Sequence, residues 1–192
     1  MSDAQPGPDG RLRCPWALSP PDHLAYHDLE WGRPVRTVPG LFERLTLEGF
    51  QSGLAWITIL RKREGFRGAF ADFDADRVAA YTDADRTRLM ADATIVRNRA
   101  KIDATVHNAS VVARLGEGFV DLVWSHRPVG HRRPTPDEHR ATSPESVALA
   151  KALKAEGIRF VGPTTAYALM QAVGLVDDHL QACEVPDPAD LR

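Results

Sequence analysis

The residue types best suited to chemistry are two cysteines and two of the histidines, which lie near opposite ends of the 192-residue chain. His179 and Cys183 are four residues apart, a spacing that places an imidazole and a thiol on one face of a helix. Cys14 and His27 could complete a tetrahedral set that suits zinc. Because four protein ligands leave no open coordination position, such a zinc would be structural. A disulfide between Cys14 and Cys183, or free buried cysteines beside ordinary histidines, explains the same residues.

A second group combines aromatic side chains with one acidic residue. Glu48 follows apolar residues in a stretch that is predicted to be a core helix. A buried carboxylate is costly unless it is paired or hydrogen-bonded, so its presence there invites a functional explanation. The large aromatic residues of the first third of the chain are Trp16, Tyr26, Trp31 and Trp56. The competing interpretation is a glutamate at the exposed end of a helix.

The third group is a glycine-containing connection, residues 157–165, between two predicted helices. Gly157 and Gly162 flank a short apolar segment, and they allow backbone N–H groups to turn outward where the second helix begins. Such a hairpin can hold a DNA phosphate without reading sequence. An ordinary interhelical turn explains the same spacing.

The elements that must position these residues are predicted to be helices. Apolar residues recur at three- and four-residue spacing over residues 39–48, 51–62 and 95–115, and residues 22–30 and 166–173 are further helix candidates. Gly49 is the expected turn between two of these helices, and Asp74 and Asp83 are expected N-caps. Ser143 followed by Pro144 predicts another helix start, with Gly157 at its end. Alternating apolar and polar runs are scarce, so the architecture is predicted to be all-α without a sheet.

Composition sets the broad class. The formal net charge is -2, so any nucleic-acid site must be a local patch, and no apolar run approaches the ~20 residues that span a bilayer. Two cysteines are too few for a disulfide scaffold and fit a reducing cytoplasm. Residues 1–10 lack the pattern of a secretory signal and are expected to be a disordered lead. Residues 125–142, rich in proline, histidine and arginine, predict a long surface loop.

Several short motifs occur in the order found in the DNA-3-methyladenine glycosylase I family, which the chain resembles from about residue 11 to residue 185. The motifs are RCPW at 13–16, AYHD at 25–28, EWG at 30–32, LEGFQSGLAW at 47–56, RNRAKI at 97–102, FVGPTT at 160–165 and DH at 178–179. The resemblance implies a helix-hairpin-helix glycosylase fold with two helical lobes around a base pocket in one domain, residues 11–185, followed by a tail, 186–192. It also implies a structural zinc that joins the chain ends through Cys14, His27, His179 and Cys183.

The function that the resemblance implies is base excision repair. A monomeric, cytoplasmic enzyme would act on double-stranded DNA that contains alkylated adenine, flip out 3-methyladenine and hydrolyse its N-glycosidic bond. Glu48 would be the catalytic residue, accepting a hydrogen bond from the base amine and opposing the positive charge of the base. The residues that would contact the base are Tyr26, Trp56, His23, Trp16 and Trp31. No lysine stands beside the pocket motif to form a Schiff base, so strand cleavage is not expected.

The resemblance also implies DNA contacts and contains departures. The implied DNA contacts are Gly53, Leu54 as a wedge, Lys101, Gly157, Gly162, Thr164 and Thr165. His23 stands where a second pocket tyrosine is expected, Thr94 where glycine is frequent, and Asp177 where asparagine usually precedes the Asp-His pair. The alternative function is a zinc-stapled DNA-binding module without catalysis, which would have no use for Glu48 in an aromatic pocket. A zinc hydrolase would need an open metal position.

Overall fold

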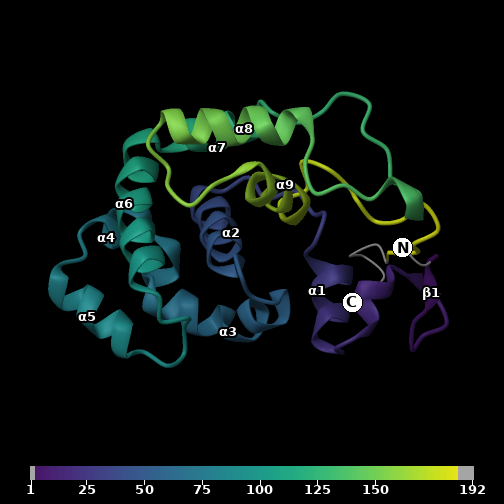
Figure 1. The fold of residues 1–192 in the computed structure, drawn as a ribbon, viewed down its shortest axis with the longest axis horizontal. Coiled ribbons are helices and arrows are strands. Elements are labelled where there is room, and N and C mark those ends of the chain that lie inside the picture. The colour runs from purple at the N-terminus through teal and green to yellow at the C-terminus, as the bar shows by residue number, and fades with distance from the viewer. Residues whose placement is uncertain (1–2, 186–192) are drawn as a thin grey trace.

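The computed structural model describes residues 3–185, and nine α-helices make up most of this part of the chain, as predicted for an all-α protein (Figure 1). The helices are α1 (Asp22–Leu29), α2 (Val38–Gln51), α3 (Trp56–Ala69), α4 (Ala75–Ala79), α5 (Asp83–Ala91), α6 (Arg99–Leu115), α7 (Glu117–Trp124), α8 (Pro144–Ala155) and α9 (Pro163–Ala172). Three short 3-10 helices, η1 (Pro15–Leu18), η2 (Ala71–Phe73) and η3 (Pro136–Glu138), join them. Within residues 3–185 no helix is long and apolar enough to cross a membrane.

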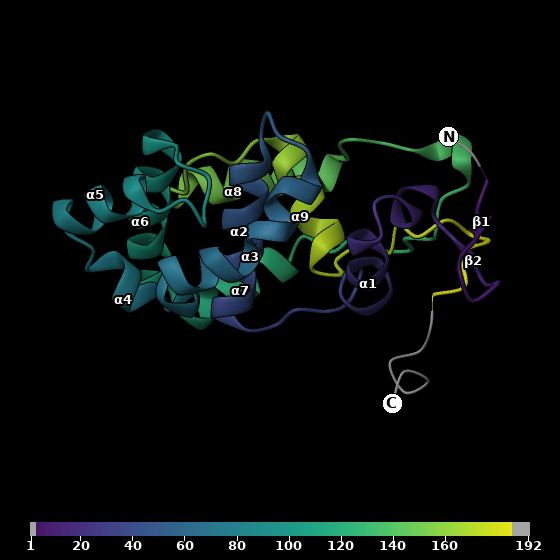
Figure 2. The same ribbon diagram turned by 90° about the horizontal axis from the view of Figure 1, so that it is seen from below.

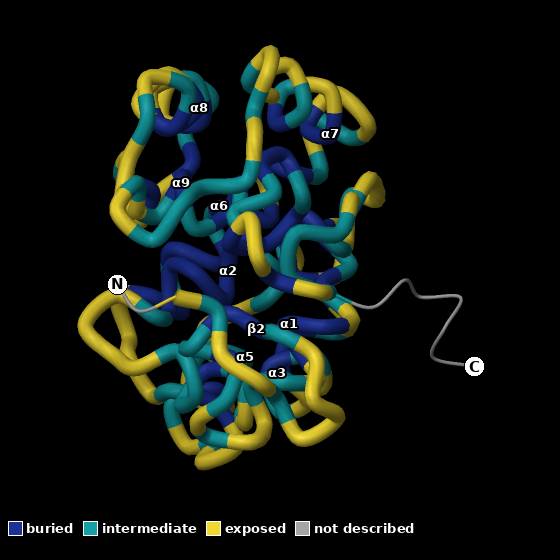
Figure 3. The backbone as a smooth tube through the Cα atoms, turned by 90° about the vertical axis from the view of Figure 1, so that its right-hand side faces the viewer, coloured by how far each residue is buried: buried dark blue, intermediate teal, exposed yellow. Residues whose placement is uncertain are grey.

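Helix α2 is the central element of the main hydrophobic core. It contacts α3, α6, α7 and α9, and these helices surround it in two perpendicular views (Figures 1 and 2). Leu41, Phe42 and Leu45 on this helix are almost completely buried, as the three- and four-residue spacing predicted. The backbone of α2 is accordingly among the most buried segments of the chain (Figure 3). A side chain near the end of α2 is therefore held by packing on several sides.

The predicted turn at Gly49 is wrong, because α2 continues to Gln51. Phe50 supplies the next core position of the helix and is almost fully buried, which outweighs the ~1 kcal/mol helix penalty of one glycine. The chain turns instead at residues 52–55, where Gly53 has φ +82°. This short turn leads directly into α3, which begins at Trp56.

Some of the predicted helix boundaries are confirmed, but α3 covers residues 56–69 where 51–62 was predicted, and α6 begins at Arg99 where residue 95 was predicted. The Asp74 side chain accepts a hydrogen bond from the Arg77 amide at the start of α4, and Ser143 caps α8 with Pro144 at its first position. Gly157 follows α8 with φ +103°. The predicted cap at Asp83 is wrong by one residue. Thr82 is the N-cap there, because its hydroxyl accepts from the amide three residues later and completes a capping box.

The amino-terminal residues differ from the expected disordered lead. In the described residues 3–10, β1 (Gln5–Pro6) pairs antiparallel with β2 (Leu12–Arg13), so a small ribbon exists where no sheet was expected. The Asp9 carboxylate accepts from the Arg11 amide and from the Arg13 guanidinium, which closes the turn of this ribbon. Arg13 is itself buried and donates to both carboxylate oxygens of Asp28. The predicted tail 186–192 lies outside the described residues.

Residues 125–142 are irregular apart from η3, as predicted for a loop. The loop is attached to the carboxyl-terminal segment, since the Gln181 amide donates to the Pro134 carbonyl and the Arg133 guanidinium donates to the Cys183 carbonyl. These contacts keep the loop beside the amino-terminal elements in both ribbon views (Figures 1 and 2). The loop is thus held against the rest of the protein by hydrogen bonds at Arg133 and Pro134.

Candidate functional site

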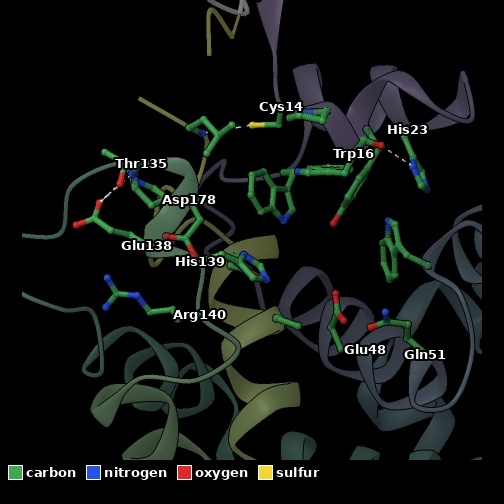
Figure 4. Close-up of a pocket in the computed structure, with 18 residues that line it drawn as sticks. Cys14, Trp16, His23, Glu48, Gln51, Thr135, Glu138, His139, Arg140 and Asp178 are labelled. Carbon is green, nitrogen blue, oxygen red and sulfur yellow. Dashed lines mark hydrogen bonds between the residues drawn. The ribbon is translucent and has the colours of Figure 1, made fainter. Parts of the chain in front are cut away.

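A cavity of about 560 Å³ lies between the end of α2, the aromatic residues of the amino-terminal region and the loop 125–142 (Figure 4). The structure brings all six residues that were predicted to meet a base together around it, namely Trp16, His23, Tyr26, Trp31, Glu48 and Trp56. The opposite side of the cavity is formed by residues of α9 and of the loop. Sequence reasoning missed this second wall, which includes Pro134, Thr135, Glu138, His139 and Arg140.

The Glu48 carboxylate points into this cavity from α2 (Figure 4). The residue is 6% exposed, and no described residue donates a hydrogen bond to its side chain. Burial raises its pKa to about 8, while the positive charge of Arg44, one turn earlier, acts in the opposite direction. A carboxyl group that is held without a partner at the edge of a cavity is suited to bind a positively charged or hydrogen-bond-donating ligand.

The aromatic walls are arranged edge to face and tilted. The rings of Trp16 and Trp31 are 5.0 Å apart at 78°, and the rings of Tyr26 and Trp56 are 5.2 Å apart at 45°. Burial and the nearby Glu48 raise the pKa of Tyr26, so its ring stays neutral. Neutral aromatic faces attract cations through the ring quadrupole. Together with Glu48, these walls favour a planar ligand that carries positive charge.

Two polar atoms of the aromatic wall are buried without a partner among the described residues. His23 Nδ1 lies 3.0 Å from the Trp16 carbonyl, which can only accept, so Nδ1 carries the hydrogen and Nε2 of the neutral ring is an acceptor. This Nε2 has no donor, and the Trp56 Nε1–H has no acceptor. Unpaired buried polar atoms are expensive, and a ligand with matching groups would remove this cost.

Three of the four predicted metal ligands form one buried cluster. The ligand atoms of Cys14, His27 and Cys183 all lie within 4.8 Å of one another, and both cysteines are free. His27 Nδ1 lies 2.7 Å from the Asp28 carboxylate, and its Nε2 lies 3.5 Å from Cys183 Sγ. A hydrogen bond from the Cys14 thiol, together with His27, lowers the pKa of Cys183. A thiolate and a carboxylate-oriented imidazole are typical ligands of a metal such as zinc.

His179, the fourth predicted ligand, lies directly beside this cluster. Its ring is 4.6 Å from the His27 ring, its Nδ1 is 2.7 Å from Asp177 Oδ1, and its Nε2 is 3.4 Å from the His27 carbonyl oxygen. The space around the ring is tight, because a Cβ on Gly32 would lie 3.0 Å from His179 Cε1. His179 is thus oriented by a carboxylate in the same manner as His27.

The four-residue spacing of His179 and Cys183 does not reflect a helix, since residues 179–183 are irregular apart from a turn at 181–182. The Cys183 amide donates to the Leu180 carbonyl, and the Leu180 amide lies 3.3 Å from Cys14 Sγ. The Glu184 amide also donates to the Leu12 carbonyl. The contacts of Leu180 with Cys14 and of Glu184 with Leu12 join the two ends of the described chain.

The two aspartates before His179 have different surroundings. Asp178 lines the cavity and accepts hydrogen bonds from the Tyr167 hydroxyl at 2.6 Å and from Gln171 Nε2 at 2.8 Å. Asp177 binds His179 and Arg133, and within the described chain it is not among the residues that line the cavity. A direct catalytic contact from Asp177 to a bound base is therefore not supported by its position.

The residues that were predicted to contact DNA lie in two segments. Leu54 is 41% exposed and follows Gly53 in the turn after α2. The second segment is the connection between α8 and α9, where Gly162 is the N-cap of α9, Thr164 is exposed and Thr165 is partly exposed. In contrast to these residues, Lys101 is 9% exposed, and its Nζ donates to the carbonyls of Phe50 at 2.9 Å and Ser52 at 2.7 Å.

Phe160 lies in the predicted α8–α9 connection, whereas the residue that supports this connection from α6, Asn108, was missed by sequence reasoning. Phe160 is 49% exposed with φ +56°, a conformation that is rare for a bulky side chain. Asn108 of α6 donates to the Arg159 carbonyl and accepts from the Arg159 amide. A buried polar residue in an apolar helix face was the available signal for Asn108, although its partner is 51 residues away.

Comparisons with known proteins agree with this geometry. The model of the methyladenine glycosylase family matches residues 16–186. The chain is 46% identical to DNA-3-methyladenine glycosylase 1 of Escherichia coli over 89% of this chain and 95% of that protein. It is 44% identical to DNA-3-methyladenine glycosylase of Haemophilus influenzae over 89% of this chain and 96% of that protein. A crystal structure of 3-methyladenine DNA glycosylase I is similar with a TM-score of 0.85 and 43% identity, covering 91% of this chain and 100% of that one.

Proposed function

The chain belongs to the methyladenine glycosylase family, and from this premise we propose that it removes 3-methyladenine from alkylated DNA in base excision repair. The enzyme hydrolyses the N-glycosidic bond of a base that has been flipped out of the duplex. It is monofunctional and leaves the strand uncut, because no lysine is among the residues that line the cavity in the described chain.

The observation that carries the proposal is the Glu48 carboxylate, which is buried without a hydrogen-bond partner beside an aromatic cavity. Methylation of N3 gives the adenine in DNA a positive charge and makes it a good leaving group. Glu48 accepts a hydrogen bond from the exocyclic amine and opposes that charge, while Tyr26 and Trp56 face the ring. Neutral adenine lacks the charge that compensates the burial of Glu48, so it is selected against.

The pocket has further positions for recognition. Trp16 and Trp31 complete the aromatic wall, and His23 Nε2 is the acceptor that replaces the hydroxyl of a second tyrosine. In the neutral ring, His23 Nε2 carries no hydrogen and acts as an acceptor. It therefore pairs with a donor of the base or with a water molecule.

Duplex DNA is held by backbone groups and separated by an apolar wedge. Leu54 after Gly53 fills the gap that the flipped base leaves in the stack. Gly157, Gly162, Thr164 and Thr165 form the connection that binds a phosphate at the start of α9, where the helix dipole favours negative charge. Residues 11–185 contain the pocket, the wedge and this connection, so we propose that they work as one unit and that a monomer is sufficient. Because its substrate is DNA, the protein acts where the DNA of the cell is located.

The metal of the proposed enzyme is zinc with a structural role. Cys14, His27 and Cys183 already form a ligand cluster, and His179 would complete a tetrahedral set by a small movement of its ring. Each histidine has its Nδ1 on a carboxylate, which leaves Nε2 for the metal. A bound zinc would hold the two chain segments together, and with four protein ligands it has no open position for a substrate.

The test is the release of free base from methylated duplex DNA by the wild type and by Glu48→Gln under single-turnover conditions. Glu48→Gln preserves the shape of the side chain but removes its charge, so release of 3-methyladenine and binding of the free base should both weaken. Charge-assisted hydrogen bonds are worth ~1.5–3 kcal/mol against ~1 kcal/mol for neutral ones, which corresponds to about a tenfold loss. Glu64→Gln, which removes the same charge from an exposed position on α3, is the matched control.

Two results would contradict the proposal. If the wild type binds DNA but releases no base, the chain is a zinc-stapled DNA-binding module without catalysis. If Glu48→Gln retains release and binding within about twofold of the wild type, the carboxylate has a structural role.

A further inference from the structure

Lys101 was predicted to contact DNA, but its surroundings differ from those that a phosphate contact requires. Its side chain is buried at the start of α6, and desolvation lowers its pKa. Its Nζ donates to the carbonyls of Phe50 and Ser52 at 2.9 and 2.7 Å. An ammonium group that already spends two of its three donors on backbone oxygens in a buried position is poorly placed to bind DNA.

These two carbonyls lie on either side of Gln51, the last residue of α2. Helix ends leave carbonyl groups without an intrahelical partner, and a cation there also complements the helix dipole. The Gln51 carbonyl in turn accepts from the Leu54 amide at 2.7 Å. Lys101 therefore holds the backbone from which the turn carrying Leu54 begins.

The turn 52–55 also connects two walls of the cavity. Gln51 lines the cavity at the end of α2, and Trp56 lines it at the start of α3. A Cβ on Gly53 would meet nothing within 4 Å, and Leu54 is half exposed, so the outer part of the turn has little packing of its own. The hydrogen bonds from Lys101 come from a separate helix and supply the restraint that packing does not.

We infer that Lys101 is a positioning residue, which fixes the Gly53–Leu54 turn for insertion into the duplex and makes no direct contact with a phosphate. This inference rests on the proposed function and assigns its wedge a support on α6. It predicts that the charge of Lys101 acts on the protein backbone, whereas a phosphate contact would act through displacement of counterions from DNA.

The experiment compares Lys101→Met with the wild type, with Lys62→Met as the matched control. Lys62 also donates to a backbone carbonyl, that of Ala93 at 2.6 Å, at a site away from the turn. Amide hydrogen exchange at Leu54 in the free protein should become about tenfold faster in Lys101→Met and remain unchanged in Lys62→Met. Excision from methylated duplex should slow by about ten- to a hundredfold through misplacement of the wedge.

The salt dependence of DNA binding separates the two roles of Lys101. Loss of a phosphate contact reduces the magnitude of the negative slope of log K against log salt by about 1, whereas loss of a positioning residue leaves this slope unchanged. In addition, Lys101→Met should cause little further loss of excision in a Leu54→Ala background, because the two residues act as one unit. If Lys101→Met is unstable, Lys101→Gln, which retains a donor, is measured in the same way.

The inference would be overturned if the magnitude of this slope decreases by about 1 while amide exchange at Leu54 is unchanged. It would also be overturned if the losses of excision in Lys101→Met and Leu54→Ala are additive. A wild type that releases no methylated base would instead contradict the proposed function. The same set of measurements therefore distinguishes the two failures.

Discussion

Asp177 Oδ1 lies 2.7 Å from Nδ1 of His179, and the other oxygen of this carboxylate lies 2.8 Å from Nε of Arg133. Asp177 thereby connects the proposed metal ligand to the loop 125–142. Its contacts are those of a residue that orients an imidazole. The first prediction follows from this arrangement.

Asp177→Asn should retain most of the excision activity, because a cationic leaving group needs little acid assistance and the amide oxygen can still accept from His179. The measurement is single-turnover excision of 3-methyladenine beside the zinc content of the purified variant. A loss of more than about a hundredfold, or ~2.7 kcal/mol of barrier, with zinc still bound would show that Asp177 takes part in the reaction.

The activity should depend on pH through Glu48. Its pKa is raised to about 8 by burial, so the carboxylate of the free enzyme gains its charge only as the pH rises through that value. For wild-type enzyme, kcat/KM on methylated duplex should increase from pH 6 to pH 9, and the increase should be absent from Glu48→Gln. The opposite trend, or the same profile in both proteins, would exclude Glu48 as the titrating group.

Glu48 should also make the stability of the free enzyme fall at alkaline pH. Its folded pKa lies above the ordinary value of 4.5, so the contribution of the protonated group is complete below about pH 4.5 and is lost as the pH rises through about 8. Urea unfolding of the wild type and of Glu48→Gln at pH 5 and pH 9 measures this difference. Between pH 5 and pH 9 the wild type should lose more unfolding free energy than Glu48→Gln does. An equal loss in both proteins would count against the raised pKa of Glu48.

Cys183→Ser should lower the melting temperature more than it weakens base binding. The ligand pairs lie near opposite ends of the described chain, so zinc closes a loop of most of its length and restricts the unfolded state. Metal analysis of the wild type should find one zinc per chain, and Cys14→Ser is the matched variant at the same cluster. Metal-free wild-type protein that loses stability on reduction would favour the disulfide interpretation.

Asn108→Ala should weaken the action on duplex DNA while the affinity for free 3-methyladenine stays within about twofold. Asn108 holds both the amide and the carbonyl of Arg159, and leaving such groups unpaired costs ~1–3 kcal/mol. Asn108→Asp, which keeps the acceptor and loses the donor, should be intermediate. Equal losses in both assays would mean that the change disturbs the pocket and not only the α8–α9 connection.

The helical architecture and the membership of the pocket were accessible from the sequence. Apolar spacing marks which face of a helix is buried, and this identified the core of α2 and the caps at Asp74 and Ser143. The motifs around Tyr26, Glu48 and Trp56 placed these residues together because the family resemblance already contains the information on which distant segments meet. Local rules alone left a structural explanation for Glu48 open.

The partners of individual side chains were decided by the tertiary structure. Lys101 has the sequence features of a DNA contact, yet its Nζ donates to the Phe50 carbonyl, 51 residues away near the end of α2. Asp177 contacts His179 and Arg133 outside the cavity. Residues 179–183 do not form a helix, because the Leu180 amide bonds Cys14 Sγ and the Gln181 amide bonds the Pro134 carbonyl. Spacing along the chain reports only which residues share a face, whereas burial and hydrogen bonding over long separations depend on how the helices pack.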